Sequence, residues 1–416
     1  MNTLKTALLC LALNTITIIS FSQNISYNSH FTGERLRLDI VFAGDHSSQN
    51  CFLEAMFREP AWGGSTNNLV EKFGYGEYNY RVEDKDGNIL FSKGFNSLFQ
   101  EWRTTPEAKI TKRAMKGSYV IPFPKIAVNV IFSERSKEDG TFMDIASFTV
   151  DPTDKSISAG KTHNFDSYLL YEGGKHSQKV DLVFIAEGYT SEQMSKFRED
   201  SKRFAGYLFE MEPYKSRKSD FNIWIVESVS DESGTDIPHQ DSWARTALSS
   251  SFYTFGIDRY LTAHDQSKIA AAASQVPYDA LYVIVNTEKY GGGGIYNFYG
   301  LSMSDHKLSA EVFVHELGHS FAGLGDEYYS SEVAYEDFYD LNREPWEPNL
   351  TTKIDFRSKW EDLVEKGEAG LYEGGGYMAK GIFRPASDCR MKSNTAPGFC
   401  PVCTRAINTM IDYYIK

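Results

Sequence analysis

Residues 24 to about 155 alternate between apolar and polar positions in short runs, a pattern typical of β-strands. Over residues 34–41, the apolar Leu36, Leu38 and Ile40 are separated by charged residues. Similar short runs span residues 78–83, 89–91, 118–123, 127–132 and 146–150. Asp86-Gly87 is a hairpin signal between two of them. No long helical period interrupts these runs, so we expect an all-β antiparallel sandwich domain over residues 23–155.

From residue 177 onward the pattern changes to strands that alternate with helices. Continuous apolar runs at 180–186, 221–228 and 280–286 predict buried strands, and 3.6-residue periodicity predicts helices over 191–210, 266–274 and 309–322. This alternation predicts an α/β domain over residues 177–416. The polar segment 156–176 is expected to be the linker between the two domains.

Four consecutive glycines occupy residues 291–294. No Lys-Ser/Thr follows them, so a phosphate-binding loop is not indicated, and we expect a hinge beside a cleft. Residues 295–303 follow as a predicted edge strand. Phe298, Tyr299 and Gly300 on it are candidates for pairing with an extended peptide.

The first 22 residues resemble a targeting signal. Lys5 precedes an apolar run that ends in Ser20-Phe21-Ser22, with small residues at the positions that a signal peptidase requires. We therefore expect cleavage before Gln23 and export to the periplasm, cell surface or exterior. The run is shorter than the about 20 apolar residues of a membrane-spanning helix, so the protein is not expected to span a membrane.

The composition narrows the classes of function. The 416-residue chain has 43 basic and 56 acidic residues, a net charge of −13, which argues against nucleic-acid binding. Its hydrophobic content of 41% is sufficient for two packed cores. Oligomeric state cannot be inferred from these numbers.

The strongest chemical signal is His315-Glu316-Leu317-Gly318-His319 within the predicted helix 309–322. At 100° per residue the two histidines lie about 40° apart on one helical face, so both imidazoles can reach one Zn²⁺ ion. Glu316 projects to the same side, where it can take a proton from the water that such an ion activates. The alternative is a chance match, or two histidines satisfied within a core.

The helix is expected to end at Gly323-Leu324-Gly325, directly before two acidic residues. Asp326 is the predicted third zinc ligand, which would leave the fourth position open as in catalytic zinc sites. Glu327 is the alternative ligand, and a solvated acidic turn is the alternative for both.

Four cysteines remain after the predicted cleavage, and Cys389, Cys400 and Cys403 cluster near the C-terminus. In an exported protein we expect a structural disulfide among these three, with its connectivity open. Redox chemistry at the Cys-Pro-Val-Cys segment is less favoured. A zinc site is also less favoured, because it needs a fourth ligand and no histidine follows His319.

One further loop has metal-binding potential. Asp231, Glu232 and Asp236 form an acidic loop that is a candidate Ca²⁺ site in an exported protein. The alternative is a solvated loop without an ion.

Residues 315–328 resemble the IgA-peptidase family of zinc metallopeptidases, metallopeptidase family 64, which is related to the metzincins. Residues 389–392 and 399–403 strengthen the resemblance, which covers about residues 177–416. It implies a metzincin-like catalytic domain in which Met391 lies in a methionine turn beneath the zinc. The N-terminal sandwich is similar to the domain that precedes this catalytic unit. The chain departs from metzincins at Ala322 and Gly325, and its carboxylate comes one residue later, at Asp326.

The combined prediction is an exported zinc endopeptidase acting on extracellular proteins or glycoproteins. Tyr328, Tyr372 and Tyr377 are candidates for stabilising the transition state. The alternative is a glycan- or protein-binding surface module with a vestigial peptidase core, although the intact Glu316 argues against it. A zinc hydrolase of non-peptide amides is a third candidate.

Overall fold

The computed structural model describes residues 25–159, 165–330 and 338–416. The predicted signal peptide, residues 1–22, lies outside the described residues. Within the described residues, no helix combines the length and the apolar character needed to cross a membrane.

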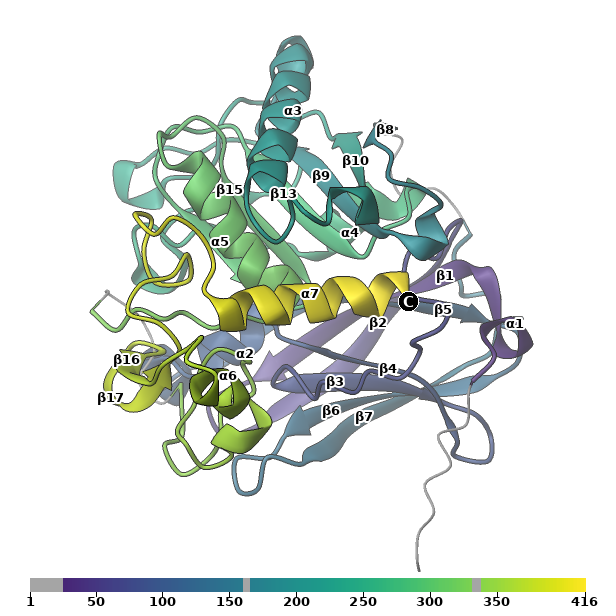
Figure 1. Cartoon of the computed structure of the whole chain (residues 1–416). Coiled ribbons are helices and arrows are strands. Elements are labelled where there is room, and N and C mark those ends of the chain that lie inside the picture. The colour runs from purple at the N-terminus through teal and green to yellow at the C-terminus, as the bar shows by residue number, and fades with distance from the viewer. Residues whose placement is uncertain (1–24, 160–164, 331–337) are drawn as a thin grey trace, which may run out of the picture.

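The N-terminal region consists of two antiparallel sheets around one core (Figure 1). The strand orders are β2-β1-β5 and β4-β3-β6-β7. The strands are β1 (Phe31–Gly44), β2 (Gln49–Glu59), β3 (Tyr78–Glu83), β4 (Ile89–Phe95), β5 (Arg113–Pro124), β6 (Val128–Arg135) and β7 (Phe142–Val150). Two short helices, α1 (Tyr27–His30) and α2 (Leu98–Arg103), accompany them. The alternating residues Leu36, Leu38 and Ile40 are fully buried in this core, as a two-sheet packing requires.

The C-terminal region has mixed α/β content and is built on a six-stranded sheet of order β14-β15-β13-β9-β10-β8. The four central strands are parallel, and both edge strands run antiparallel to their neighbours. Its strands are β8 (Asp166–Tyr171), β9 (Val180–Glu187), β10 (Phe221–Glu227), β13 (Ala280–Val285), β14 (Gly292–Ile295) and β15 (Tyr299–Met303). Strand β8 lies within the predicted linker 156–176, so that segment supplies an edge of this sheet.

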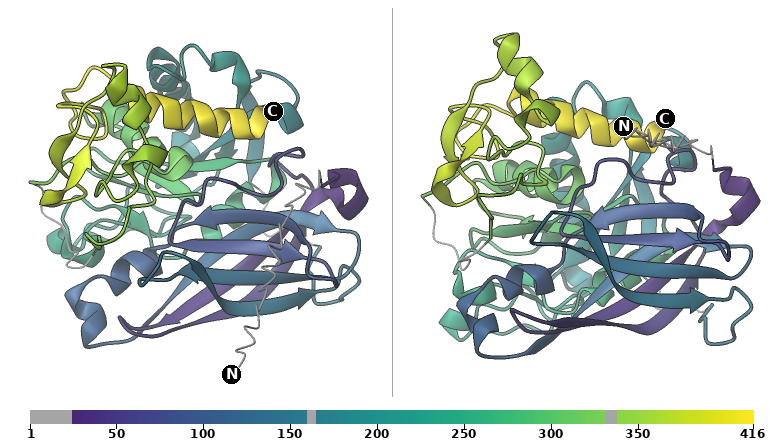
Figure 2. Two further views of the ribbon diagram at one scale, coloured as in Figure 1. Left: turned by 60° about the horizontal axis from the view of Figure 1, so that its bottom comes forward. Right: turned by 90° about the horizontal axis from the view of Figure 1, so that it is seen from below.

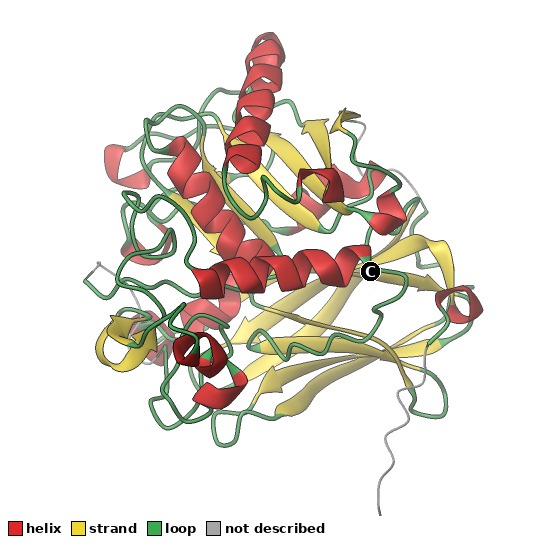
Figure 3. Ribbon diagram, in the orientation of Figure 1, coloured by secondary structure: helices red, strands yellow, loops and turns green. Residues whose placement is uncertain are grey.

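Helices cover both faces of the sheet (Figure 3). On one face are α3 (Met194–Glu210), α5 (Ser309–Ala322) and α7 (Pro401–Ile415). On the other is α4 (Ser267–Ala272). The remaining α-helix is α6 (Glu361–Glu365), and the remaining strands form the pairs β11 (Ser250–Ser251) with β12 (Thr262–Ala263) and β16 (Tyr372–Gly375) with β17 (Met378–Arg384).

The four-glycine run is not a hinge, because three of its glycines form edge strand β14 with Ile295. The run is rich in glycine because β14 lies directly against α5. A Cβ atom at Gly294 would lie 2.4 Å from the backbone oxygen of Glu316, and one at Gly292 would lie 2.9 Å from Glu316 Oε1. The predicted edge strand is also corrected: Tyr299 and Gly300 lie in β15, which is paired on both sides, and Phe298 lies in the turn before it, so these three residues do not offer a free strand edge to a substrate.

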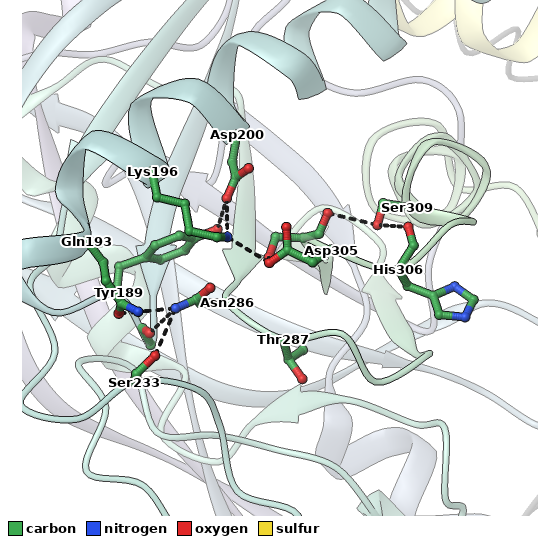
Figure 4. A network of polar contacts seen from close by, with 12 residues as sticks. Tyr189, Gln193, Lys196, Asp200, Ser233, Asn286, Thr287, Asp305, His306 and Ser309 are labelled. Carbon is green, nitrogen blue, oxygen red and sulfur yellow. Dashed lines mark hydrogen bonds and ion pairs between the residues drawn. The ribbon is translucent and has the colours of Figure 1, made fainter.

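A polar network fixes the beginning of α5 against the carboxyl ends of the central strands (Figure 4). Lys196 Nζ lies 2.7 Å from carboxylate oxygens of both Asp200 and Asp305. Ser309, the first residue of α5, donates to the backbone oxygens of Ser304 and His306. Hence the first turn of α5, the helix that carries the two motif histidines, is held in place relative to the sheet.

The two regions pack directly against each other (Figure 2). Arg35 of β1 forms an ion pair with Glu59 and donates to the backbone oxygens of Val276 and Ala273 in the C-terminal region. Asn297 Nδ2 donates to the backbone oxygen of Gly94. Because these contacts join the two regions, the N-terminal region is positioned to contribute to a site in the C-terminal region.

Candidate metal centre

Helix α5 presents His315, Glu316 and His319 and then ends sharply. Gly323 adopts φ 65°, the left-handed conformation that glycine tolerates. The N–H groups of Gly323 and Leu324 bond back to the oxygens of His319 and Gly318, which caps the helix. The chain therefore turns back toward the histidines within three residues.

Three side chains converge at this point; we call His315, His319 and Asp326 the histidine site. The Nε2 atoms of the two histidines are 3.0 Å apart. Asp326 Oδ1 lies 3.1 Å from His315 Nε2 and 3.3 Å from His319 Nε2. A carboxylate oxygen of Glu316 lies within 4.8 Å of the histidine nitrogens. The structure thus brings the sequence-predicted residues together.

The outer ring nitrogens show that this triangle fits a metal ion. His315 Nδ1 donates to the backbone oxygen of Arg390 at 3.0 Å, and His319 Nδ1 donates to that of Leu324 at 2.5 Å. Each Nδ1 therefore carries a proton, which leaves the lone pair of each neutral Nε2 directed toward the other histidine and Asp326. Three acceptors in mutual contact repel one another unless a positive charge, either a further proton or a metal ion, lies between them.

The charges of the side chains in and around the histidine site favour a bound cation. Burial would lower the pKa of His319, but the Asp326 carboxylate outweighs it and raises that pKa to about 9. Burial would raise the pKa of Asp326, yet His319 and His315 hold it well below its usual range. Burial raises the pKa of Glu316, and the two histidines oppose this shift. Glu316 is consequently a stronger base than an exposed carboxylate.

The histidine site opens into a cleft built by both regions. Besides the motif residues, the lining includes Asn96 and Glu101 of the N-terminal region, the glycines of β14, Arg259, Tyr328 and Tyr377. The side chains of His315 and His319 remain 13% and 15% exposed. A substrate can therefore approach this centre from solvent.

The three candidate tyrosines occupy different places. Tyr377 Oη hydrogen-bonds Asp326 Oδ2 and so holds the carboxylate. Tyr328 faces the cleft, where Arg259 Nη2 donates to its Oη at 3.4 Å. Tyr372 is 43% exposed on β16 and is not among the residues lining the cleft. Arg259, which the sequence analysis did not identify, brings a positive charge to the cleft from a loop without a distinguishing motif.

Met391 lies beneath α5. It is fully buried, and a Cβ atom at Gly318 would lie 2.8 Å from its Sδ. Its neighbour Arg390 accepts the hydrogen bond from His315, and the backbone oxygen of Met391 accepts one from Glu327 N–H at 2.8 Å. The segment around Met391 thus supports the histidine site from below.

Glu327 points away from the histidine site. Its carboxylate meets Cys389, Cys400 and Cys403, and we call these four residues the cysteine site. The three thiols are free in the structure, with 3.8 Å between the Sγ atoms of Cys389 and Cys403. The disulfide expected from the sequence therefore does not form here, whereas the fourth ligand that the sequence analysis found lacking is present as Glu327.

The acidic loop does not form a comparable cluster. Asp236 Oδ1 accepts from Ala244 N–H, and Glu232 Oε2 accepts from Arg245 N–H. Within the described ranges, the groups of converging potential ligands are those around the two histidines and the three cysteines. The geometry therefore offers no support for the predicted Ca²⁺ site.

Comparison with protein families identifies the family of the chain. Residues 169–369 and 366–411 match the family described as IgA Peptidase M64, and residues 26–145 match the Peptidase M64 N-terminus. No curated protein matches the chain. The chain belongs to the IgA Peptidase M64 family, and this membership implies a peptidase with a protein substrate.

Proposed function

We propose that the chain is an exported, zinc-dependent endopeptidase that hydrolyses peptide bonds of extracellular proteins or glycoproteins. The observation that carries the proposal is the triangle of His315 Nε2, His319 Nε2 and Asp326 Oδ1, with edges of 3.0 to 3.3 Å at the base of an open cleft. Two imidazoles and one carboxylate are a ligand set typical of catalytic zinc. Export is inferred from residues 1–22 alone.

Zinc bound here would supply Lewis acidity toward water and a substrate carbonyl. Glu316 takes up the proton of the attacking water and passes it to the departing amine. Tyr377 and the backbone oxygens of Arg390 and Leu324 hold the three ligands in place.

Arg259 and Tyr328 line the cleft beside the histidine site, and we assign them to stabilising the charge that develops on the substrate carbonyl. Their contact, together with the 5.7 Å separation between the guanidinium and the ring of Tyr328, keeps a cation and a phenol at one wall of the cleft. We assign Tyr328 rather than Tyr377 to transition-state stabilisation, because Tyr377 Oη is engaged with Asp326.

Strand β14 supports an extended peptide as substrate. It is the edge strand of the sheet beside α5, and its glycines line the cleft. Gly292 already pairs with Tyr260, so a substrate peptide would form backbone hydrogen bonds only with the part of this edge that follows Gly292. This favours a protein substrate over a small amide.

The position of Met391 beneath α5 supports a metzincin-like arrangement of the centre.

The position of the N-terminal region argues against the alternative function, a binding module with a vestigial peptidase core. Asn96 and Glu101 line the same cleft, and Tyr260 Oη hydrogen-bonds Glu101 Oε2. The two regions thus form one site in which the base Glu316 is intact.

The test is the Glu316→Gln variant, assayed for cleavage of an unfolded protein substrate and for zinc content. We expect activity to fall by about 10²- to 10⁴-fold, the contribution of a general base, with unchanged zinc and melting temperature. Glu199→Gln, an exposed glutamate on α3, is the matched control and should remain fully active. Undiminished activity in Glu316→Gln would overturn the proposal.

A further inference from the structure

The cysteine site is a closed cluster that the proposed peptidase chemistry does not use. Cys389, Cys403 and Glu327 are at most 1% exposed, and Cys400 is 6% exposed. One ligand atom from each of the four residues lies within 4.8 Å of the other three. The four residues come from three separate segments: the turn after α5, the segment of Met391, and the beginning of α7.

The distances within the cluster match those around one tetrahedral ion. Zinc–sulfur bonds of about 2.3 Å at tetrahedral angles place two sulfurs about 3.8 Å apart. The Sγ atoms of Cys389 and Cys403 are 3.8 Å apart, and Cys403 Sγ lies 3.2 Å from Glu327 Oε1. Cys400 and Cys403 have the two-residue spacing of paired zinc ligands, and Cys400 N–H points at Cys389 Sγ at 3.2 Å.

Glu327 supplies an independent indication that a ligand is needed. Its Oε1 accepts from Asn349 Nδ2 at 3.0 Å, whereas its buried Oε2 has no hydrogen-bond partner. In the described part of the chain, no basic side chain forms an ion pair with this carboxylate. A carboxylate without an ion-pair partner is costly to bury, and a divalent cation would offset that cost.

A disulfide explains the cluster less well. It would join two of the three sulfurs and leave the third thiol buried beside an unpaired carboxylate. Soft thiolates with one carboxylate select zinc over magnesium or calcium. A site with four protein ligands has no open position, which is the arrangement of structural rather than catalytic zinc.

We propose that Glu327, Cys389, Cys400 and Cys403 bind a second, structural Zn²⁺ ion. The ion would tie the turn after α5 to α7 and to the segment of Met391. Because Glu327 directly follows Asp326, this ion also fixes the backbone from which the third ligand of the histidine site projects. Zinc at the cysteine site therefore positions Asp326 without touching substrate.

The test removes the histidine site and asks whether zinc remains. The full-length mature His315→Ala/His319→Ala double variant is purified without added metal and analysed for zinc content. We expect about one zinc ion per chain in the variant and about two in the parent protein. Cobalt loaded into the same variant should show sulfur-to-cobalt charge-transfer absorption, and the further change Glu327→Gln should weaken that binding.

Counting the free thiols tests the alternative of a disulfide without any mutation. The mature protein is denatured with a chelator but without reductant, and its cysteines are alkylated. Zinc binding predicts that Cys51 and all three cluster cysteines are modified, whereas a disulfide leaves two unmodified. Cys51→Ser, a buried cysteine outside the cluster, is the control and should keep both zinc ions. Two protected cysteines, or no zinc in the double variant, would overturn the proposal whatever the peptidase activity is.

Discussion

The histidine site and the cysteine site receive consecutive residues of one turn but differ in nearly every physical property. Asp326 meets two imidazoles at the base of a cleft, and Glu327 meets three sulfurs in the core. The first group offers three protein ligands and stays partly exposed; the second offers four and is closed. Access to solvent and the number of protein ligands therefore distinguish a centre suited to catalysis from one suited to structure.

Hydrogen bonds hold the turn from both sides. Asp326 is held by Tyr377, and its backbone oxygen accepts from Gly376 N–H at 2.8 Å. Glu327 is held by Asn349 and by the backbone oxygen of Met391. Neither residue can move without disturbing the other, so the two sites should be coupled mechanically although they share no ligand.

The largest expected effect is on refolding without metal. A structural zinc contributes about 10–16 kcal/mol in small zinc domains, which is comparable to the about 5–15 kcal/mol stability of a whole domain. Protein unfolded with a chelator should therefore fail to regain its native near-ultraviolet circular dichroism until zinc is returned.

Chelation of the folded protein separates the two sites. It should remove the exposed metal of the histidine site first, abolishing peptidase activity with little change in melting temperature. Equal rates of loss from both sites would contradict the distinction between an open and a closed centre.

The next effect is that of Asp326→Asn, which keeps the size of the side chain and removes its charge. We expect the zinc affinity of the histidine site to fall by more than the about 10–100-fold typical of losing a partner behind a ligand. Competition with a chromophoric chelator measures this affinity, and the cysteine site should keep its zinc.

Glu327→Gln is the matched control for Asp326→Asn. It should weaken the cysteine site and leave the ligand set of the histidine site intact. If Glu327→Gln removed the zinc of the histidine site while Asp326→Asn retained it, the assignment of the two carboxylates would be reversed.

These two carboxylates show how much of the two sites could be predicted from the sequence alone. The helix predicted over 309–322 is α5 (Ser309–Ala322), and the motif spacing alone placed both histidines on one face. Glu327 was considered only as an alternative ligand for the histidine site, because sequence spacing does not reveal that neighbouring side chains in a turn face opposite sides. The cysteine site is therefore a product of tertiary structure, because Glu327 precedes each of the three cysteines by 62 or more positions in the sequence.

The strands show a similar limit. Alternation in residues 78–83 predicted β3 (Tyr78–Glu83) to the residue. The same reasoning failed for β14, because glycine has low strand propensity and the strand forms there through its close approach to Glu316 on α5. Arg259 carries no motif at all, and only the folded cleft identifies it.

A smaller effect is expected from Tyr377→Phe, which removes the hydroxyl that contacts Asp326. Phenylalanine keeps the ring packing against Tyr328 and Phe338. Loss of a partner behind a metal ligand should lower zinc affinity at the histidine site by about 10–100-fold. Activity should return at saturating zinc. A kcat that stays low at saturating zinc would instead assign Tyr377 to transition-state stabilisation.

The smallest effect is expected at Met391, which contacts both the helix of the histidine site and Glu327 of the cysteine site. Its backbone oxygen binds Glu327 N–H, and its side chain packs beneath Gly318, between the two histidines on α5. Met391→Leu keeps the backbone contact and nearly the same volume, so we expect a loss of less than about 1.5 kcal/mol in unfolding free energy. Met391→Ala should cost about 2–5 kcal/mol because it opens a cavity under α5.

Urea unfolding and zinc content together decide what Met391 contributes. If the side chain only fills the space beneath α5, Met391→Leu keeps both zinc ions and nearly all activity, and Met391→Ala lowers zinc affinity at the histidine site before it affects the cysteine site. This order follows because the backbone bond to Glu327 survives in both variants, whereas the support under α5 does not. Loss of zinc from the cysteine site first would show that the side chain, rather than the backbone, links the two centres.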